Sequence, residues 1–178
     1  MIWIKSDNRL QAAIGLAACN AIINRPDLDY DKGNVTTAFT VGPSDCFGMV
    51  GEFKPILRKI EDKTEKVYVF EQNIPEGSDM YSSTDIPKYL PKCNVVVITA
   101  TSIINHTIDD LLTNCKSARE LCLVGPSTPL CPDLFKKYKV NLLAGTIVKS
   151  PEMALEIVSQ GGGTMDLKEA IQNVLVRI

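Results

Sequence analysis

Short apolar runs alternate with amphipathic segments along most of the chain, and this alternation restricts the fold more than any other feature. Short runs rich in β-branched residues are typical of strands, and apolar residues spaced by three and four are typical of helices. Strands and helices that alternate through short links pair in parallel through right-handed crossovers. We therefore expect an α/β fold, a Rossmann-like, doubly wound and mainly parallel sheet of about five or six strands with helices on both faces. The predicted strands are 47–51, 66–71, 94–100, 120–125 and 141–148, and the predicted helices are 53–62, 82–90, 107–115, 132–137 and 150–159.

The two ends of the chain add further elements. Residues 7–24 place apolar side chains at helical spacing, which predicts a helix. The β-branched stretch 35–41 indicates another strand. Asp166 is followed three residues later by Glu169, a pair that can cap a helix, so we expect a final helix that ends at Ile178.

Composition excludes several classes of protein. No apolar run approaches the roughly 20 residues of a membrane helix, and the first residues lack the apolar core of a signal peptide, so we expect a cytoplasmic protein with no membrane partner. The six cysteines form no CxxC pair, which is typical of reduced thiols rather than of a disulfide framework. A net charge of -2 and a pI near 5.5 leave no basic surface for nucleic acid.

Polar residues and glycines gather where the predicted strands end. In an open α/β sheet, ligands bind in the crevice beyond the carboxyl ends of the strands. Gly125 would let the backbone approach a ligand there, and Ser127 and Thr128 offer hydroxyl groups. Alternatively, residues 125–129 form only a strand-to-helix turn in which Ser127 or Thr128 caps local backbone. The strand-end residues are Gly51 to Phe53, Glu71, Thr99 to Asn105, Gly125 to Thr128, and Gly145 with Thr146.

Glu71 supports a nucleotide-type ligand. It lies 20 residues after Gly51 at the end of the next predicted strand, where the acid of a dinucleotide site meets a ribose hydroxyl. The glycines at 48 and 51 are spaced GxxG rather than GxGxxG, and Lys54 and Pro55 follow closely. A tight turn followed by a surface carboxylate is the simpler alternative.

Metal binding and nucleophilic catalysis both depend on His106, the single histidine. With Cys46, Cys131, Glu52 and Glu71 it offers ligands for a softer divalent ion, although no paired spacing indicates a closed zinc site. The sequence contains no GxSxG elbow, and any Cys–His or Ser–His pair must use His106. The alternative is a solvent-exposed histidine at the start of a helix.

Several motifs, in the same order along the chain, resemble one known family. The segments VGEFKPIL, VYVFEQN, VITATSIINHTIDDLL, ELCLVGPSTPLCPDLF, VNLLAGTIV and SQGGGT are similar to the Rossmann-like domain of the family catalogued under "putative heavy-metal chelation". The resemblance covers roughly residues 45–165. It implies a cleft formed by strand-end loops, with an enolase-N-terminal-like domain before it and the family's proposed active site between the two. The family commonly has glycine where this chain has His106.

The resemblance also implies how the chain divides and which residues form the cleft. Residues 1–34 are then an N-terminal helix and linker, the remnant of the preceding domain, and residues 35–178 are the Rossmann-like domain. A second subunit would supply the missing wall of the cleft, so we expect a homodimer. His106 and Glu71 are the candidate metal ligands. Carried over position by position, the cleft residues are Gly51, Glu52, Phe53, Glu71, Thr99, Thr101, Asn105, Thr107, Gly125, Pro126, Ser127, Thr128 and Gly145.

Three functions are compatible with these residues. The first is heavy-metal chelation or the binding of a small polar ligand in the cleft, with a divalent metal or a metal chelate as the candidate cofactor. The second is an enzyme that uses a nucleotide-type cofactor whose ribose is held by Glu71. The third is a truncated interaction domain that a partner subunit completes.

Overall fold

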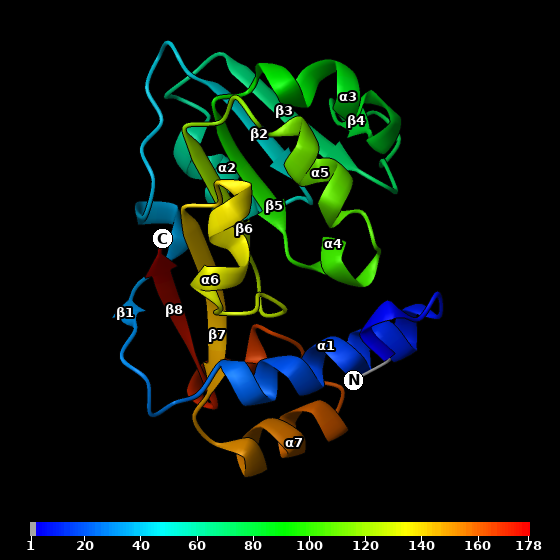
Figure 1. Cartoon of the computed structure of the whole chain (residues 1–178), viewed down its shortest axis with the longest axis vertical. Coiled ribbons are helices and arrows are strands. Elements are labelled where there is room, and N and C mark those ends of the chain that lie inside the picture. The colour runs from blue at the N-terminus through cyan, green and yellow to red at the C-terminus, as the bar shows by residue number, and fades with distance from the viewer. Residues whose placement is uncertain (1–2) are drawn as a thin grey trace.

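An eight-stranded sheet forms the centre of the computed structural model, which describes residues 3–178 (Figure 1). Its strands are β1 (Asp31–Lys32), β2 (Cys46–Val50), β3 (Lys66–Glu71), β4 (Tyr81–Ser82), β5 (Val95–Thr99), β6 (Glu120–Val124), β7 (Leu142–Val148) and β8 (Ile171–Arg177). They lie in the order β1-β8-β7-β6-β5-β2-β3-β4. Neighbours from β4 to β7 pair in parallel, whereas β8 pairs antiparallel with β7, and β1 with β8.

The parallel part of the sheet confirms the predicted doubly wound fold. Numbered in chain order from β2, strands β2 to β7 lie 3-2-1-4-5-6 across the sheet, the order of dinucleotide-binding Rossmann folds. The order reverses between β2 and β5, which pair with Phe47 opposite Val95. This switch point is where sheets of this kind open a crevice for a ligand.

Strand β5 lies at the centre of the core and is buried on both faces. Its residues from Val95 to Ile98 are at most 1% exposed, as the unbroken apolar run predicts for a central parallel strand. Successive side chains point to opposite faces. Val96 and Ile98 therefore pack under α3, α5 and α6, while Val95 and Val97 pack on the side of α2. The sheet thus has a helical layer on each face.

Most helices begin and end close to the predicted residues, although the helix predicted at 82–90 is α-helical only over Ile86–Tyr89 and is flanked by 3₁₀ helices. The α-helices are α1 (Arg9–Ile23), α2 (Lys54–Ile60), α3 (Ile86–Tyr89), α4 (Thr101–Ile104), α5 (Ile108–Asn114), α6 (Pro132–Phe135) and α7 (Pro151–Ser159). The side chain of Asn8 caps α1 by accepting hydrogen bonds from the first-turn amides of Leu10 and Gln11. Short α4, directly after β5, was not predicted. Within residues 3–178, no helix is long and apolar enough to cross a bilayer.

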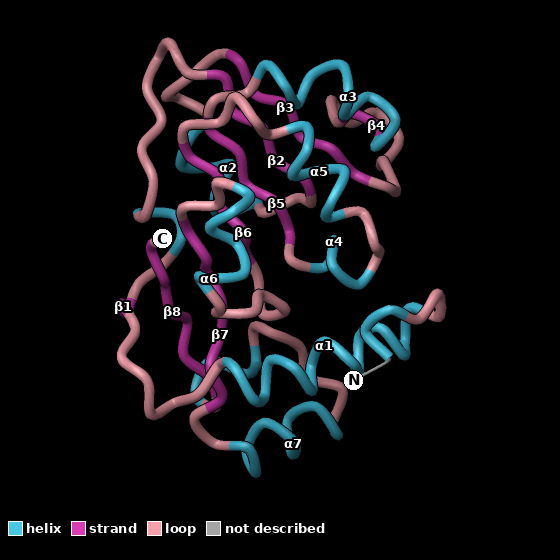
Figure 2. Tube along the Cα trace, viewed as in Figure 1, coloured by secondary structure: helices cyan, strands magenta, loops and turns pink. Residues whose placement is uncertain are grey.

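The strand predicted at 35–41 is wrong. The side chain of Asn34 accepts the Thr36 N–H and starts a 3₁₀ helix, Val35–Thr37, and the chain then continues as a loop (Figure 2). Ala38 and Val41 are buried against the α2 face of the sheet. The nearby edge of the sheet is already occupied by β8 and β1, so this apolar segment covers the core instead of extending the sheet.

The final helix predicted up to Ile178 is also wrong, because most of it is strand β8. Asp166 accepts the Gly163 N–H at 2.8 Å and begins only a 3₁₀ helix, Asp166–Glu169. The chain then pairs with β7 along the whole length of both strands, from Leu142 opposite Arg177 to Val148 opposite Ile171. Pairing with an open edge of β7 therefore prevails over a local capping signal.

Candidate functional site

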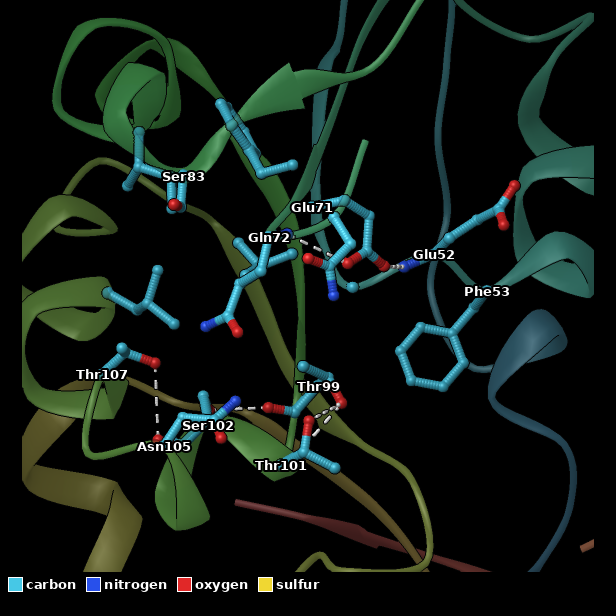
Figure 3. Close-up of a pocket in the computed structure, with 16 residues that line it drawn as sticks. Glu52, Phe53, Glu71, Gln72, Ser83, Thr99, Thr101, Ser102, Asn105 and Thr107 are labelled. Carbon is cyan, nitrogen blue, oxygen red and sulfur yellow. Dashed lines mark hydrogen bonds between the residues drawn. The ribbon is translucent and has the colours of Figure 1, made fainter. Parts of the chain in front are cut away.

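A cavity of about 280 Å³ opens at the carboxyl ends of β2, β3 and β5, at the switch point of the sheet (Figure 3). We call it the β2–β5 cavity. Because the carboxyl ends of parallel strands meet at one edge, residues far apart in the sequence line it together. Its lining residues are Val50, Gly51, Glu52, Phe53, Phe70, Glu71, Gln72, Asn73, Ser83, Ile86, Thr99, Thr101, Ser102, Asn105, Thr107 and Leu111.

The turn after β2 depends on Gly51. Its φ of +86° lies in the left-handed region, and a Cβ atom on this residue would lie 2.9 Å from Cβ and Cγ2 of Thr99. The Gly51 N–H donates to the Phe70 carbonyl at 3.0 Å. Only glycine fits both the conformation and the close approach of β5. The turn therefore sits directly against the end of the neighbouring strands.

The carboxylate of Glu71, at the end of β3, is fixed by backbone N–H groups. Oε1 accepts the Glu52 N–H at 2.6 Å, and Oε2 accepts the Gln72 N–H at 3.3 Å. Figure 3 shows this carboxylate facing the turn after β2, whereas the side chain of Glu52 extends away from the threonines on the opposite wall. A carboxylate has about four acceptor sites, so Glu71 keeps acceptor capacity for a ligand.

Hydroxyl and amide groups form the opposite wall. The Oγ1 atoms of Thr99 and Thr101 lie 2.9 Å apart, and the Ser102 hydroxyl donates to the Thr99 carbonyl at 2.6 Å. Asn105 and Thr107 follow on the loop between α4 and α5 (Figure 3). These side chains are uncharged donors and acceptors, which suits the orientation of a polar ligand.

The cavity also includes polar residues that are not among the predicted cleft residues. Gln72 and Asn73 directly follow Glu71, so counting the two residues after β3 as part of the strand end would have included them. Ser102 lies between two named residues. Ser83 comes from a 3₁₀ helix, Ser83–Asp85, and no sequence pattern marks its position over the sheet.

The predicted cleft residues do not all line the same cavity. Eight of them line the β2–β5 cavity, namely Gly51, Glu52, Phe53, Glu71, Thr99, Thr101, Asn105 and Thr107. Gly125, Pro126 and Gly145 line a neighbouring hollow of about 140 Å³, to which Phe53 also contributes. Ser127 and Pro126 line a third cavity beside α1. Thr128 is fully buried, and its hydroxyl has no hydrogen-bond partner within residues 3–178.

The loop after β6 is held by α1 through its backbone. Asn20 Nδ2 donates to the Ser127 carbonyl at 2.9 Å, and Asn24 Nδ2 donates to the Thr128 carbonyl at 2.9 Å. Asn24 Oδ1 accepts the Leu130 N–H at 2.8 Å. The backbone around Ser127 and Thr128 thus forms a docking point for the N-terminal helix. Gly145 permits the same packing, because a Cβ there would lie 2.9 Å from Leu130 and 3.2 Å from the Thr128 carbonyl.

Of the five candidate metal ligands, Glu52 and Glu71 line the β2–β5 cavity, whereas His106, Cys46 and Cys131 do not. His106 is exposed, its Nε2 lies 2.9 Å from the Ser6 carbonyl, and it is not among the residues that line the β2–β5 cavity. Cys46 lies at the amino end of β2, with its sulfur 3.6 Å from that of Cys93. Within the described part of the chain, no group of three or more His, Cys, Asp or Glu side chains is placed to hold a metal ion.

His106 has a left-handed backbone conformation, which favours glycine. Its φ of 57° is left-handed, and the residue links α4 to α5. Glycine adopts this conformation without steric cost, whereas a side chain with a Cβ is disfavoured. Residue 106 therefore forms the turn between α4 and α5, and its imidazole contacts the backbone carbonyl of Ser6 in the N-terminal segment.

The strand order and the cavity at its switch point define the class of protein, an α/β protein of the Rossmann-like type. The chain belongs to the DUF364 family, whose model matches residues 34–177 and carries the description "Putative heavy-metal chelation".

Three relatives have the same fold or a similar sequence. A DUF364 protein of unknown function from Desulfitobacterium hafniense has a crystal structure that matches with a TM-score of 0.85 and 31% identity, covering 99% of this chain and 71% of that one. A second, from Pyrococcus horikoshii, matches with a TM-score of 0.89 and 26% identity, covering 99% and 72%. An uncharacterized protein of Methanocaldococcus jannaschii is 26% identical over 174 residues, which are 95% of this chain and 67% of the relative.

Proposed function

We propose that this protein binds a small polar ligand in the β2–β5 cavity and that Glu71 holds adjacent hydroxyl groups of that ligand. The observation that carries the proposal is the placement of the Glu71 carboxylate, which is fixed on the turn after β2 at the switch point of the sheet. In Rossmann folds, an acid at the end of the second strand accepts hydrogen bonds from ribose hydroxyls. The same acid also accepts a backbone N–H here, which keeps it in a single orientation.

A metal would enter the cavity as part of the ligand. The family description points to metal chelation, and Glu71 offers carboxylate oxygen to a divalent ion. The absence of a three-residue ligand group within residues 3–178 leaves most coordination positions to a chelating molecule. The metal-chelate form of the proposal therefore uses the same cavity and the same carboxylate.

The position of Glu71 also favours a second candidate, an enzyme that uses a nucleotide-type cofactor. In that case, the cofactor ribose occupies the cavity beside Glu71, and the substrate approaches from the Thr99–Thr101 side. Binding of a ribose-containing compound is common to both candidates. It is consequently the property to measure first.

Titration calorimetry with adenosine, 2′,3′-dideoxyadenosine and the zinc–citrate complex tests the proposal. Binding through hydroxyl groups predicts that adenosine binds at least about tenfold more tightly than the dideoxy compound, because a buried acceptor is left unpaired without them. Glu71→Gln should weaken adenosine binding by about tenfold, since the amide cannot make charge-assisted hydrogen bonds.

Glu65→Gln is the matched control. Glu65 is exposed and precedes the amino end of β3, at the opposite edge of the sheet from the cavity. Its substitution should leave every affinity unchanged. The proposal fails if neither adenosine nor the zinc complex binds with a dissociation constant below the millimolar range, or if Glu71→Gln and Glu65→Gln behave alike.

A further inference from the structure

We infer that the ligand of the β2–β5 cavity is an unphosphorylated nucleoside, either neutral or positively charged, an inference that rests on the proposed function. A Rossmann-like sheet with an acid at the end of its second strand would ordinarily suggest a dinucleotide. The turn after β2, however, lacks the features that bind a pyrophosphate. The hydrogen bonds, the start of α2 and the charges of the lining each exclude phosphate for a separate physical reason.

The amides of the turn are already occupied. Phosphates bind where free backbone N–H groups converge, usually in the glycine-rich turn between the first strand and its helix. Here the N–H groups of residues 51–53 donate in chain order to the Phe70 carbonyl at 3.0 Å, the Glu71 carboxylate at 2.6 Å and the Met49 sulfur at 3.3 Å. The Glu71 carboxylate thus accepts a turn N–H group that would otherwise be free to bind a phosphate oxygen.

The start of α2 and the glycine before the turn are equally unsuited to phosphate. Pro55 lies in the first turn of α2 and has no N–H to donate. Gly48 is a packing residue, because a Cβ there would lie 2.9 Å from both the Cys93 sulfur and Leu90 Cδ1. It lies within β2 and does not shape a loop around a ligand. The GxxG spacing therefore reflects the packing of β2 and the tight turn at Gly51.

The charges of the lining favour a ligand without negative charge. Among the described residues, the lining includes two carboxylates, Glu52 and Glu71, and no Lys, Arg or His. The nearest basic partner of Glu52 is Lys54, whose side chain is 68% exposed, with its nitrogen 3.9 Å from Glu52 Oε2. A phosphate dianion would therefore meet two carboxylates with only the exposed Lys54 beside them, whereas an ammonium or sulfonium group would be attracted.

The remaining lining suits a heterocycle attached to a sugar. Phe53 lies at the edge of the cavity with its ring exposed to it (Figure 3), and aromatic rings stack on nucleobases. Gln72, Asn73 and Asn105 supply amide donors and acceptors for a base edge. The volume of about 280 Å³ is close to the lower limit of roughly 300 Å³ for small-molecule pockets, which fits one nucleoside rather than a dinucleotide.

Three adenosine derivatives that differ only at the 5′ position test the inference. They are 5′-amino-5′-deoxyadenosine, which is cationic at neutral pH, adenosine, and adenosine 5′-monophosphate. Calorimetry at low ionic strength should place their affinities in this order, with the monophosphate at least about tenfold weaker than adenosine. The same measurement in 0.5 M salt should reduce the differences, because screening weakens the charge effect.

A charge reversal in the lining provides the second test. Glu52→Lys should raise the affinity for the monophosphate relative to adenosine by about tenfold, and Glu65→Lys, at the other edge of the sheet, should leave the ratio unchanged. Tighter binding of the monophosphate to the unmodified protein overturns the inference and leaves the proposed function intact. No binding of any of the three compounds also overturns the inference, and the proposed function fails with it if the zinc–citrate complex does not bind either.

Discussion

At the scale of single residues, the residue type at position 51 is restricted both by the turn after β2 and by the neighbouring strand β5. Both its left-handed φ and the closeness of Thr99 require glycine. Gly77 offers a direct comparison, because its φ of +76° is similar and a Cβ atom added there would meet nothing within 4 Å. Substitutions at these two glycines therefore separate the free-energy cost of a left-handed side-chain-bearing residue from the cost of a steric clash.

Gly51→Ala should therefore destabilise the protein more than Gly77→Ala does. The shared left-handed conformation costs about 1–2 kcal/mol in each variant. The Cβ of Gly51→Ala must in addition displace Thr99, which adds about 1–3 kcal/mol. Urea unfolding curves of both variants and the original protein measure the difference. Equal losses of stability would show that the approach of β5 to the turn has no energetic consequence.

Asp45 connects the amino-terminal ends of the strands and should make stability depend on pH. It is 7% exposed and accepts hydrogen bonds from the Gly42 N–H at 2.7 Å, Asn94 Nδ2 at 2.8 Å and Arg119 Nη2 at 2.7 Å. Burial alone would raise the pKa of this carboxyl group. The hydrogen bonds from Arg119, Gly42 and Asn94 outweigh burial and hold the pKa below its ordinary value of 3.8.

Because the folded-state pKa of Asp45 is lowered, its contribution to the free energy of unfolding is complete above pH 3.8 and is lost as the pH falls through the folded-state value. Asp45→Asn should cost about 1–3 kcal/mol at neutral pH, because buried donors lose their charged acceptor. The difference from the original protein should shrink below pH 3.8. Asp27→Asn, in an exposed ion pair with Arg25, is the control and should change little. A difference that stays constant down to pH 2 would contradict the assignment.

At the scale of elements, the sequence identified the five central strands β7, β6, β5, β2 and β3, and it missed β8 and the two-residue strands β1 and β4. Strand β5 is a continuous β-branched run, and its burial follows from its composition alone. Strand β8 is formed because β7 has an open edge, and a local capping pattern at Asp166 gave the opposite prediction. Two-residue strands such as β4 are too short to leave a pattern. The local sequence pattern therefore predicts strands that are long, apolar and buried, and it does not predict strands that form only by pairing with a neighbour.

The candidate site follows the same division. Glu71 and Thr99 were found because each ends a strand that the sequence predicts correctly, and parallel pairing brings those ends together. Ser127 and Thr128 were named for their hydroxyl groups, yet their backbone carbonyls make the observed contacts, with Asn20 and Asn24 of the N-terminal segment. No pattern in the sequence indicates that a helix distant in the chain will pack against the loop after a strand. The expectation that ligands bind at the carboxyl ends of the strands therefore locates the correct edge of the sheet. It does not show which loops at that edge line a cavity and which contact the rest of the chain.

At the scale of the whole molecule, the N-terminal segment is joined to the sheet at two places. Asn20 and Asn24 contact the loop after β6, and β1 pairs with β8, with Asp31 opposite Leu175. Figure 1 shows α1 lying below the carboxyl-terminal edge of the sheet, with β1 beside β8. The division of the chain at residue 34 and the homodimer both stay predictions. The first test of the division is whether the N-terminal segment unfolds together with the sheet.

We expect a single cooperative transition, because the buried Asn24 hydrogen bonds tie α1 to the core. Trp3, the only tryptophan, reports on this segment, since its 3₁₀ helix packs against α1 at Gly15. Its fluorescence and the far-ultraviolet circular dichroism should therefore change at the same urea concentration. In Asn24→Ala, which leaves a buried carbonyl and N–H unpaired at a cost of about 1–3 kcal/mol, the fluorescence should change first. Separate transitions in the original protein would instead show that residues 1–34 fold independently of the Rossmann-like sheet. The hydrogen bonds of Asn24 would then not couple the unfolding of α1 to that of the sheet.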